Sequence, residues 1–231
     1  TMYKYVRSLR LRPAEIYDRY VAQPYDPPEL FGQKWQMDVK FVPRVCYAGK
    51  DPFERAFQYT MIDEATRERF IYAYKEHSGY SSADFIQRAV LYFGYAPITI
   101  QTDNGTEFTN PKGTGDGKVH IADRVMQRLG IKHQLIRPYT PRHNGKVERS
   151  HRTDQERFYN YLQYVTFEEL QEKMQAWLIR YNKKPHTALR NRYGKYAWQS
   201  PLEKRAELLE ILKEGTTDAR VRFVKNTART A

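Results

Sequence analysis

The chain of 231 residues has little cysteine, no long apolar segment and fewer acidic than basic side chains. Its one cysteine, Cys46, excludes a disulfide framework and a zinc site built from cysteines, and it fits a reducing, cytosolic compartment. The longest apolar-leaning stretch, Ala89–Ile100, is interrupted by Gly94 and Pro97. This stretch is too short to span a bilayer, so we expect no membrane partner.

The excess of basic over acidic side chains makes the chain strongly basic. Its 39 Lys and Arg residues against 27 Asp and Glu residues give a formal net charge of +12. A charge of this size attracts polyanions and favours nucleic acid as the partner. The content of hydrophobic residues, 40%, is high enough for a folded core and excludes wholesale disorder.

Three regions differ in their residue patterns. Residues 1–30 carry several arginines and prolines and predict a basic arm or linker, without a convincing helix-turn-helix. Residues 31–214 contain the strand and helix patterns and are expected to form one core that includes the C-terminal helices. Residues 215–231 are basic, lack a core pattern and predict a tail.

The core region predicts three strands followed by alternating helices and strands. Lys34–Phe41 alternates apolar and polar residues with the period of a half-buried strand. The other predicted strands are Ala56–Ile62, Arg69–Tyr74, Ile98–Thr102 and Ile131–Ile136, and the predicted helices are Ser81–Phe93 with Ser82 as N-cap, Ile121–Leu129, Asn144–Tyr164 and two that open with the capping boxes Thr166-x-x-Glu169 and Ser200-x-x-Glu203. The order β-β-β-α-β-α-β-α implies an α/β fold, with a mixed sheet flanked by helices.

Three carboxylates occupy positions that this topology can bring together. Asp38 lies in the middle of the first strand, Asp103 directly follows the fourth strand, and Glu148 lies in the first turns of the long helix. Neighbouring strands are about 5 Å apart, and a helix packed beside them can supply the third carboxylate. Because clustered carboxylates repel one another without a cation, the pattern predicts a site for Mg²⁺ or Mn²⁺. Two such ions would support an in-line displacement at phosphate.

Glu148 is the one acid in a basic segment. The cations between positions 132 and 152 are Lys132, Arg137, Arg142, Lys146, Arg149 and Arg152. A lone carboxylate among cations is unusual on a solvated face but is expected where a metal ligand lies beside a DNA backbone. We expect DNA contacts from Asn104, Arg142, His143, Asn144, Lys146, Arg149 and Arg152.

Three sequence blocks resemble the catalytic blocks of retroviral-integrase-type transposases, and most closely those of bacterial insertion sequences. The blocks are Trp35-Gln36-Met37-Asp38, Thr102-Asp103-Asn104-Gly105-Thr106-Glu107-Phe108 and Asn144-Gly145-Lys146-Val147-Glu148-Arg149-Ser150-His151-Arg152-Thr153. The later segments Arg180–Leu189 and Ser200-Pro201 resemble the downstream signature of the same group. The blocks occur in the right order from Gln33 to Pro201, which makes the resemblance much more specific than any single block.

This resemblance implies a ribonuclease-H-like fold in which Asp38, Asp103 and Glu148 form the DDE triad and hold two Mg²⁺ or Mn²⁺ ions. The implied activity is hydrolysis at transposon ends, followed by attack of the freed 3′-hydroxyl on target DNA. The implied partners are transposon-end DNA, target DNA and further copies of the chain in a dimer or larger assembly, with room for an accessory ATPase or a target-selection protein. A bacterial cytoplasmic, nucleoid-associated location follows from the same resemblance.

Two features depart from the family pattern. The spacing between Asp103 and Glu148, 148 − 103 = 45 positions, is longer than usual, and the Gly-rich stretch Asn110–Lys118 is expected to be an inserted loop. Gln155 occupies a position where many relatives carry a basic residue.

Two other functions fit part of these observations. A nuclease of the same fold, acting on RNA–DNA hybrids or junctions, would use the same carboxylates, but the segment around Tyr181–Leu189 argues against it. A non-catalytic DNA-binding protein that inhibits a parent transposase by mixed assembly is the other alternative, against which the intact triad argues. Asp63 and Glu107 are expected to serve local hydrogen bonding, and His151 is expected to be a packed residue.

Overall fold

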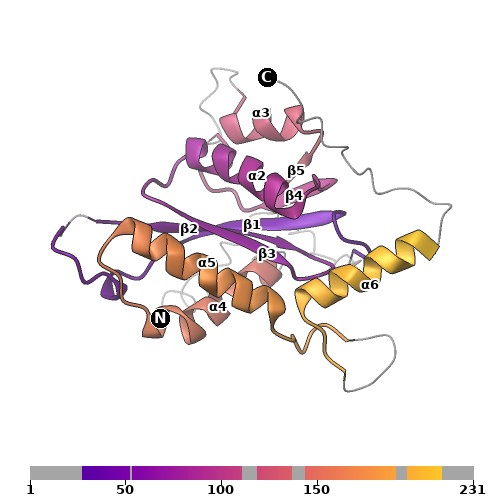
Figure 1. The fold of residues 1–231 in the computed structure, drawn as a ribbon. Coiled ribbons are helices and arrows are strands. Elements are labelled where there is room, and N and C mark those ends of the chain that lie inside the picture. Colours follow the sequence, from indigo (N-terminus) through magenta and orange to yellow (C-terminus); the bar gives the residue numbers. More distant parts are fainter. Residues whose placement is uncertain (1–27, 53, 111–118, 137–143, 191–196, 215–231) are drawn as a thin grey trace, which may run out of the picture.

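A mixed sheet of five strands forms the centre of the computed structural model, which describes residues 28–52, 54–110, 119–136, 144–190 and 197–214 (Figure 1). The strands are β1 (Lys34–Phe41), β2 (Phe57–Asp63), β3 (Arg69–Tyr74), β4 (Thr99–Thr102) and β5 (Lys132–Leu135). They lie in the order β3-β2-β1-β4-β5, in which β1, β2 and β3 pair antiparallel and β4 and β5 are parallel to β1. This arrangement confirms the predicted mixed α/β architecture.

Helices cover both faces of the sheet (Figure 1). The helices are α2 (Gly79–Phe93), α3 (Ile121–Arg128), α4 (Gly145–Arg157), α5 (Phe167–Lys183) and α6 (Pro201–Glu214), and short 3-10 turns lie at η1 (Arg44–Cys46) and η3 (Tyr159–Tyr161). Helices α2 and α3 lie on one face, α4 and α5 lie on the other, and α6 lies to the side. In the described ranges, every helix is too short or too polar to cross a bilayer.

Successive side chains of β1 point to opposite faces of the sheet, so the two faces of this strand have different surroundings. Trp35 and Met37 are fully buried, and the ring of Trp35 packs 4.3 Å from that of Phe93 in α2. Because successive side chains of a strand point to opposite faces, Gln36 and Asp38 face α4 instead. One side of β1 therefore builds the core, and the other side carries the predicted catalytic residue.

The helix predicted over Asn144–Tyr164 is wrong in its length. Helix α4 ends at Arg157, and Phe158 has φ −127° and ψ −63°, which is not helical. The chain then turns so that Tyr159 is buried in the core, while Phe158 stacks on Trp177 of α5 with ring centroids 5.5 Å apart. Burial of these two aromatic rings overrides the local helical pattern.

The start of α2 also differs from the prediction. Ser78, and not Ser82, is the N-cap, because its Oγ accepts the backbone N–H of Ser81 at 3.2 Å. The structure confirms the two capping boxes. Thr166 at the start of α5 and Ser200 before α6 each accept the N–H of the glutamate three residues later.

Candidate active site

The parallel pairing of β1 with β4 places Asp38 next to Asp103. The paired register ends with Gln36 opposite Gln101, Asp38 and Asp103 each lie two residues further along their segments, and the negative charge of Asp103 acts on Asp38. Oδ1 of Asp103 accepts the backbone N–H of Gly105 at 2.9 Å. This local turn fixes the carboxylate at the end of β4.

Glu148 lies in the first turn of α4, and its negative charge acts on Asp38. Burial raises the pKa of Asp38 from 3.8 to about 7, and the negative charges of Asp103, Glu148 and Glu107 add to the rise. The three predicted catalytic residues therefore lie on one side of the sheet and interact electrostatically. In the part of the chain that the structure describes, however, no three His, Cys, Asp or Glu side chains are arranged to hold one ion. The carboxylates converge without forming a closed metal site.

Glu107 brings a fourth carboxylate to this side of the sheet. Its Oε1 lies 2.9 Å from Nε2 of His77, and its charge acts on Asp38. A Cβ at Gly105 would lie 2.5 Å from the carboxylate oxygens, so the absence of a side chain there makes room for Glu107. We predicted local hydrogen bonding for Glu107, and its pairing with the sequence-distant His77 was missed.

His151 is a second residue whose place the sequence did not reveal. Its Nδ1 lies 3.4 Å from Oδ2 of Asp38, and its Nε2 lies 3.0 Å from Oγ1 of Thr60. Burial lowers the pKa of His151 to about 4, so the ring is neutral at neutral pH. The residue is packed, as predicted, but it packs against the candidate catalytic carboxylate. Its spacing of three residues from Glu148, close to one helical turn, is the signal that could have indicated this.

Lys40 places a cation beside α4. It lies two residues after Asp38 on the same face of β1, and its Nζ lies 3.3 Å from Oε1 of Gln155. Burial lowers the pKa of Lys40. A basic group thus lies next to Gln155 although position 155 itself is neutral.

Two buried amides hold the beginning of α4 against the sheet. Oε1 of Gln36 accepts the backbone N–H groups of Lys146 and Val147, both at 3.1 Å. Oδ1 of Asn144 accepts a hydrogen bond from Nε2 of Gln101 at 3.3 Å. The first N–H groups of a helix have no acceptor within the helix, so these contacts fix the turn that carries Glu148.

A buried ion pair holds the second half of α4. Asp154 accepts hydrogen bonds from Nη1 and Nη2 of Arg69 in β3 at 3.0 and 2.6 Å, and both side chains are fully buried. Gln58 of β2 and Trp177 of α5 donate to the same carboxylate at 2.8 and 2.7 Å. Although burial alone raises the pKa of Asp154, the charge and hydrogen bonds of Arg69 lower it overall. Helix α4 is therefore tied to two strands and to α5.

The predicted DNA contacts divide into groups. Asn104, Arg149 and Arg152 are exposed, and Nε of Arg152 lies 3.8 Å from Oε1 of Glu156. The amide of Asn104 also donates to the carbonyl of residue 136 at 2.9 Å, which links the ends of β4 and β5. Arg142 and His143 lie outside the described residues.

Two further predicted contacts serve the scaffold. Nζ of Lys146 lies 2.5 Å from Oε2 of Glu64, a buried carboxylate, and burial lowers the pKa of Lys146. Asn144 is only 3% exposed, and its amide is occupied within the fold. The burial of Asn144 argues against its predicted contact with DNA.

Comparison with known proteins identifies the family of this arrangement. Two family models described as integrase core domain match residues 29–141 and 129–193. The chain belongs to the integrase core domain family. A putative integrase of Spiroplasma virus SpV1-C74 is 31% identical over 163 residues, which are 64% of this chain and 42% of that protein. An insertion element IS476 protein of Xanthomonas euvesicatoria is 28% identical over 131 residues, 56% of this chain and 35% of that protein. The chain thus spans less than half the length of these curated relatives.

Solved integrase structures share the fold. The catalytic core domain of BIV integrase matches with a TM-score of 0.53 and 20% identity, covering 80% of this chain and 99% of that one. The HTLV-2 integrase core in complex with magnesium matches with a TM-score of 0.53 and 18% identity, over 76% and 97% of the two chains. A simian T-cell lymphotropic virus intasome matches with a TM-score of 0.57 and 14% identity, over 89% and 62%. These likenesses confirm the ribonuclease-H-like fold.

Proposed function

We propose that this chain is the catalytic core of a DNA transposase that hydrolyses transposon ends and joins the freed 3′-hydroxyl to target DNA. The observation that carries this proposal is the convergence of Asp38, Asp103 and Glu148 on one side of an integrase-type sheet. Membership of the integrase core domain family supports polynucleotidyl transfer as the type of reaction. The finer steps follow from the chemistry of the three side chains.

The donor set fits divalent metal ions such as Mg²⁺ or Mn²⁺. Carboxylate oxygens are the ligands that these hard cations prefer. The pKa of Asp38 is raised mainly by burial and further by the charges of Asp103, Glu148 and Glu107, and a cation would stabilise its charged form. Two bound ions would activate the attacking oxygen and stabilise the leaving oxygen at the phosphate. Asp38, Asp103 and Glu148 would hold them. Glu148 is exposed, so its side chain is free to change rotamer while the strands stay in place.

The chain's own residues position this chemistry. Asp38 is held by a central strand and contacted by His151, while the anchored α4 presents Glu148. The exposed Arg152, about one helical turn after Glu148, attracts the phosphate backbone. The nucleophiles are water and a DNA hydroxyl, so we expect no covalent protein–DNA intermediate.

The proposed partners are transposon-end DNA, target DNA and further copies of the chain. Joining two ends requires two active sites on one DNA complex, and the simian T-cell lymphotropic virus relative is described as an intasome. An accessory ATPase finds no support in the relatives reported above, and we do not include it.

The test uses Asp38→Asn, Asp103→Asn and Glu148→Gln with Mg²⁺ and duplex DNA made from the inverted repeats that flank the gene. We expect each variant to lose end cleavage and strand transfer while it keeps binding DNA. Glu172→Gln, a change of an exposed acid on α5, is the matched control and should keep full activity. Full activity in any of the three variants removes that residue from the catalytic set.

The products separate the proposal from its alternatives. A nuclease of the same fold yields nicked strands and no joined molecules. A non-catalytic inhibitor yields neither product and shows no metal dependence in a Mg²⁺ or Mn²⁺ titration followed by calorimetry. Joined DNA whose yield requires all three carboxylates is the result expected here.

A further inference from the structure

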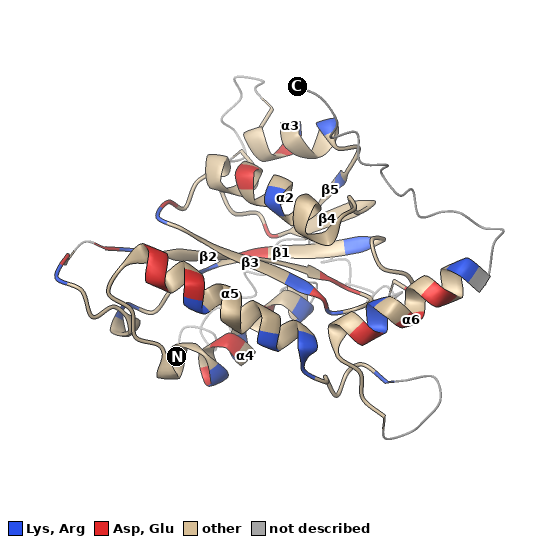
Figure 2. Ribbon diagram, viewed as in Figure 1, with Lys and Arg blue, Asp and Glu red and all other residues tan. Residues whose placement is uncertain are grey.

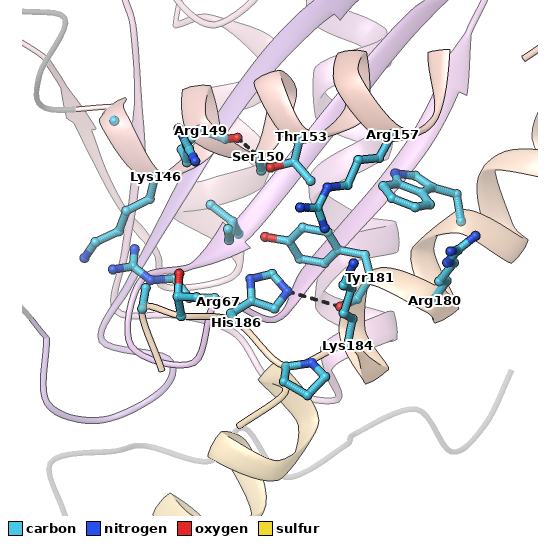
Figure 3. Close-up of a pocket in the computed structure, with 16 residues that line it drawn as sticks. Arg67, Lys146, Arg149, Ser150, Thr153, Arg157, Arg180, Tyr181, Lys184 and His186 are labelled. Atoms are coloured by element: carbon cyan, nitrogen blue, oxygen red, sulfur yellow. Dashed lines mark hydrogen bonds between the residues drawn. The ribbon is translucent and has the colours of Figure 1, made fainter. Parts of the chain in front are cut away.

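A basic cavity of about 340 Å³ lies between α4, the end of α5 and the segment that follows α5 (Figure 3). Lys146 and Arg67 lie at one end of the cavity, while Arg157 reaches from α4 toward Tyr181 of α5 (Figure 3). The lining contains six cations and, among the described residues, no acid: Arg67, Lys146, Arg149, Arg157, Arg180 and Lys184. We call this cavity the basic groove.

The basic groove lies on a different side of α4 from the candidate active site. Each residue of an α-helix turns about 100° from the one before it, so Thr153 lies about 140° around the helix from Glu148. Arg149, Thr153 and Arg157 follow one another at spacings of four and line the groove. The buried Asp154 faces the sheet between the two sides. One helix thus presents a carboxylate on one flank and cations on the other.

Four of the groove's cations are exposed and uncompensated. In the part of the chain that the structure describes, Arg149, Arg157, Arg180 and Lys184 form no ion pair with an acid. Lys146, by contrast, is paired with a buried glutamate. Like charges gathered in one cavity repel one another, so the arrangement favours an anionic ligand.

Helix dipoles account for only part of this charge. Acidic residues mark the start of α5 and basic residues its end, as the dipole favours (Figure 2). The same effect favours Arg157 in the last turn of α4. It does not account for Arg149 near the beginning of α4, nor for the convergence of both helices' cations on one cavity.

We propose that the basic groove binds the phosphodiester backbone of a DNA segment other than the one held at the carboxylates. From residue 145 to residue 157 the helix rises about 18 Å, which corresponds to about five base pairs at about 3.4 Å per pair. The planar guanidinium groups of Arg149, Arg157 and Arg180 suit bidentate contacts with phosphate oxygens. This inference rests on the proposed function, because both require DNA, but it concerns a separate surface.

The test compares two triple variants that lose the same charge. Arg157→Ala/Arg180→Ala/Lys184→Ala removes exposed cations of the groove, and Arg124→Ala/Arg128→Ala/Lys132→Ala removes exposed cations around α3, on the other face of the sheet. Binding to a fluorescent duplex of arbitrary sequence is measured by anisotropy in EDTA over a range of salt concentrations. Circular dichroism checks that both variants keep the wild-type fold.

We expect the groove variant to bind roughly tenfold or more weakly and to lose about 0.9 from the slope of log K against log salt for each phosphate contact removed. The α3 variant should keep a slope close to that of the wild type. Arg157→Lys/Arg180→Lys, which retains the charge, should restore the slope. Equal slopes in the two triple variants would overturn the proposal. It would also be overturned if the groove variant lost binding to a poly-glutamate peptide but bound DNA normally, because that result would assign the groove to an acidic protein.

This measurement can contradict the groove proposal without contradicting the proposed function. Because it is made in EDTA, it does not depend on cleavage or strand transfer. If Asp103→Asn kept strand transfer while the groove variant lost its slope, the catalytic proposal alone would fail. If the wild type joined DNA while the groove variant bound normally, the groove proposal alone would fail.

Discussion

Replacement of Asp38 by Asn is expected to stabilise the metal-free fold at neutral and higher pH. Burial, together with the charges of Asp103, Glu148 and Glu107, raises the pKa of Asp38 from 3.8 to about 7. Between these two values the folded state binds more protons than the unfolded state, so the stability contributed at this site falls as pH rises. An amide at position 38 carries no charge at any of these pH values and escapes this loss.

The size of the effect follows from the shift in pKa. The difference, 7 − 3.8 = 3.2, corresponds to about 4 kcal/mol at 1.36 kcal/mol for each pKa unit. The side chain of Asp38 is 21% exposed, so screening by solvent makes this value an upper bound. The gain in unfolding free energy of Asp38→Asn over the wild type should be absent below pH 4, about 2 kcal/mol near pH 5.5 and complete above pH 7.

Urea unfolding of the wild type and Asp38→Asn in EDTA, from pH 4 to pH 8, measures this effect. The difference in unfolding free energy between the two proteins cancels the titration of groups that they share. Asp84→Asn provides a control without this pH dependence. Although burial raises the pKa of Asp84, hydrogen bonds from Tyr74 and Arg88 lower it overall, so the carboxyl is charged in both the folded and the unfolded state above about pH 4, and the difference in unfolding free energy between this variant and the wild type should stay nearly constant from pH 4 to pH 8. A difference between wild type and Asp38→Asn that stays constant with pH would refute the reasoning.

Magnesium should reverse the order of stability. A bound cation stabilises the charged carboxylates of the wild type, so the free energy of unfolding should rise with Mg²⁺ concentration. Asp38→Asn lacks one ligand and should respond much less. An equal response in both proteins would place the ion elsewhere.

Three further changes test the supports of the fold. Arg69→Met leaves Asp154 buried and unpaired and should cost about 3–5 kcal/mol in urea unfolding, whereas Arg69→Met/Asp154→Leu should cost less; equal costs would contradict the role of the ion pair. Gly32→Ala should destabilise by about 1 kcal/mol or more, because its φ is +76° and a tyrosine ring would lie 3.0 Å from the new Cβ, while Gly145→Ala, with no atom within 4 Å, should be nearly neutral in thermal unfolding. Gln36→Leu removes the acceptor of two N–H groups and should cost about 1–2 kcal/mol, with faster hydrogen exchange confined to the first turn of α4.

The positions of Asp38 and Asp103 in the fold could be predicted because these residues follow local periodicity. The alternation of β1 is readable from Trp35, Met37 and the polar residues between them, and it correctly sets Asp38 on the face opposite the core. The position of Asp103 just after a short apolar strand fixes it at a strand end, beside the neighbouring strand. Family resemblance then added the third block around Glu148.

The parts that could not be predicted depend on contacts between distant residues. The sequence predicts a packed His151, but nothing local indicates that it contacts Asp38 or that Asp154 pairs with Arg69. The end of α4 was missed for the same reason, because burial of Phe158 against α5 outweighs a continuous helical pattern. A residue whose packing, hydrogen-bond or ion-pair partner lies in another element cannot be recognised from the sequence around it.

Helix α4 has three sides with different proposed roles, and this arrangement separates effects that would otherwise be confused. Its buried side is anchored by Gln36 and Arg69, one flank carries Glu148, and the opposite flank forms the basic groove. Because one rigid helix sets both flanks, loosening an anchor should weaken strand transfer and groove binding together. A change on one flank should affect only that flank. The pattern of paired and separate losses therefore tests whether α4 is the element that couples DNA binding to catalysis.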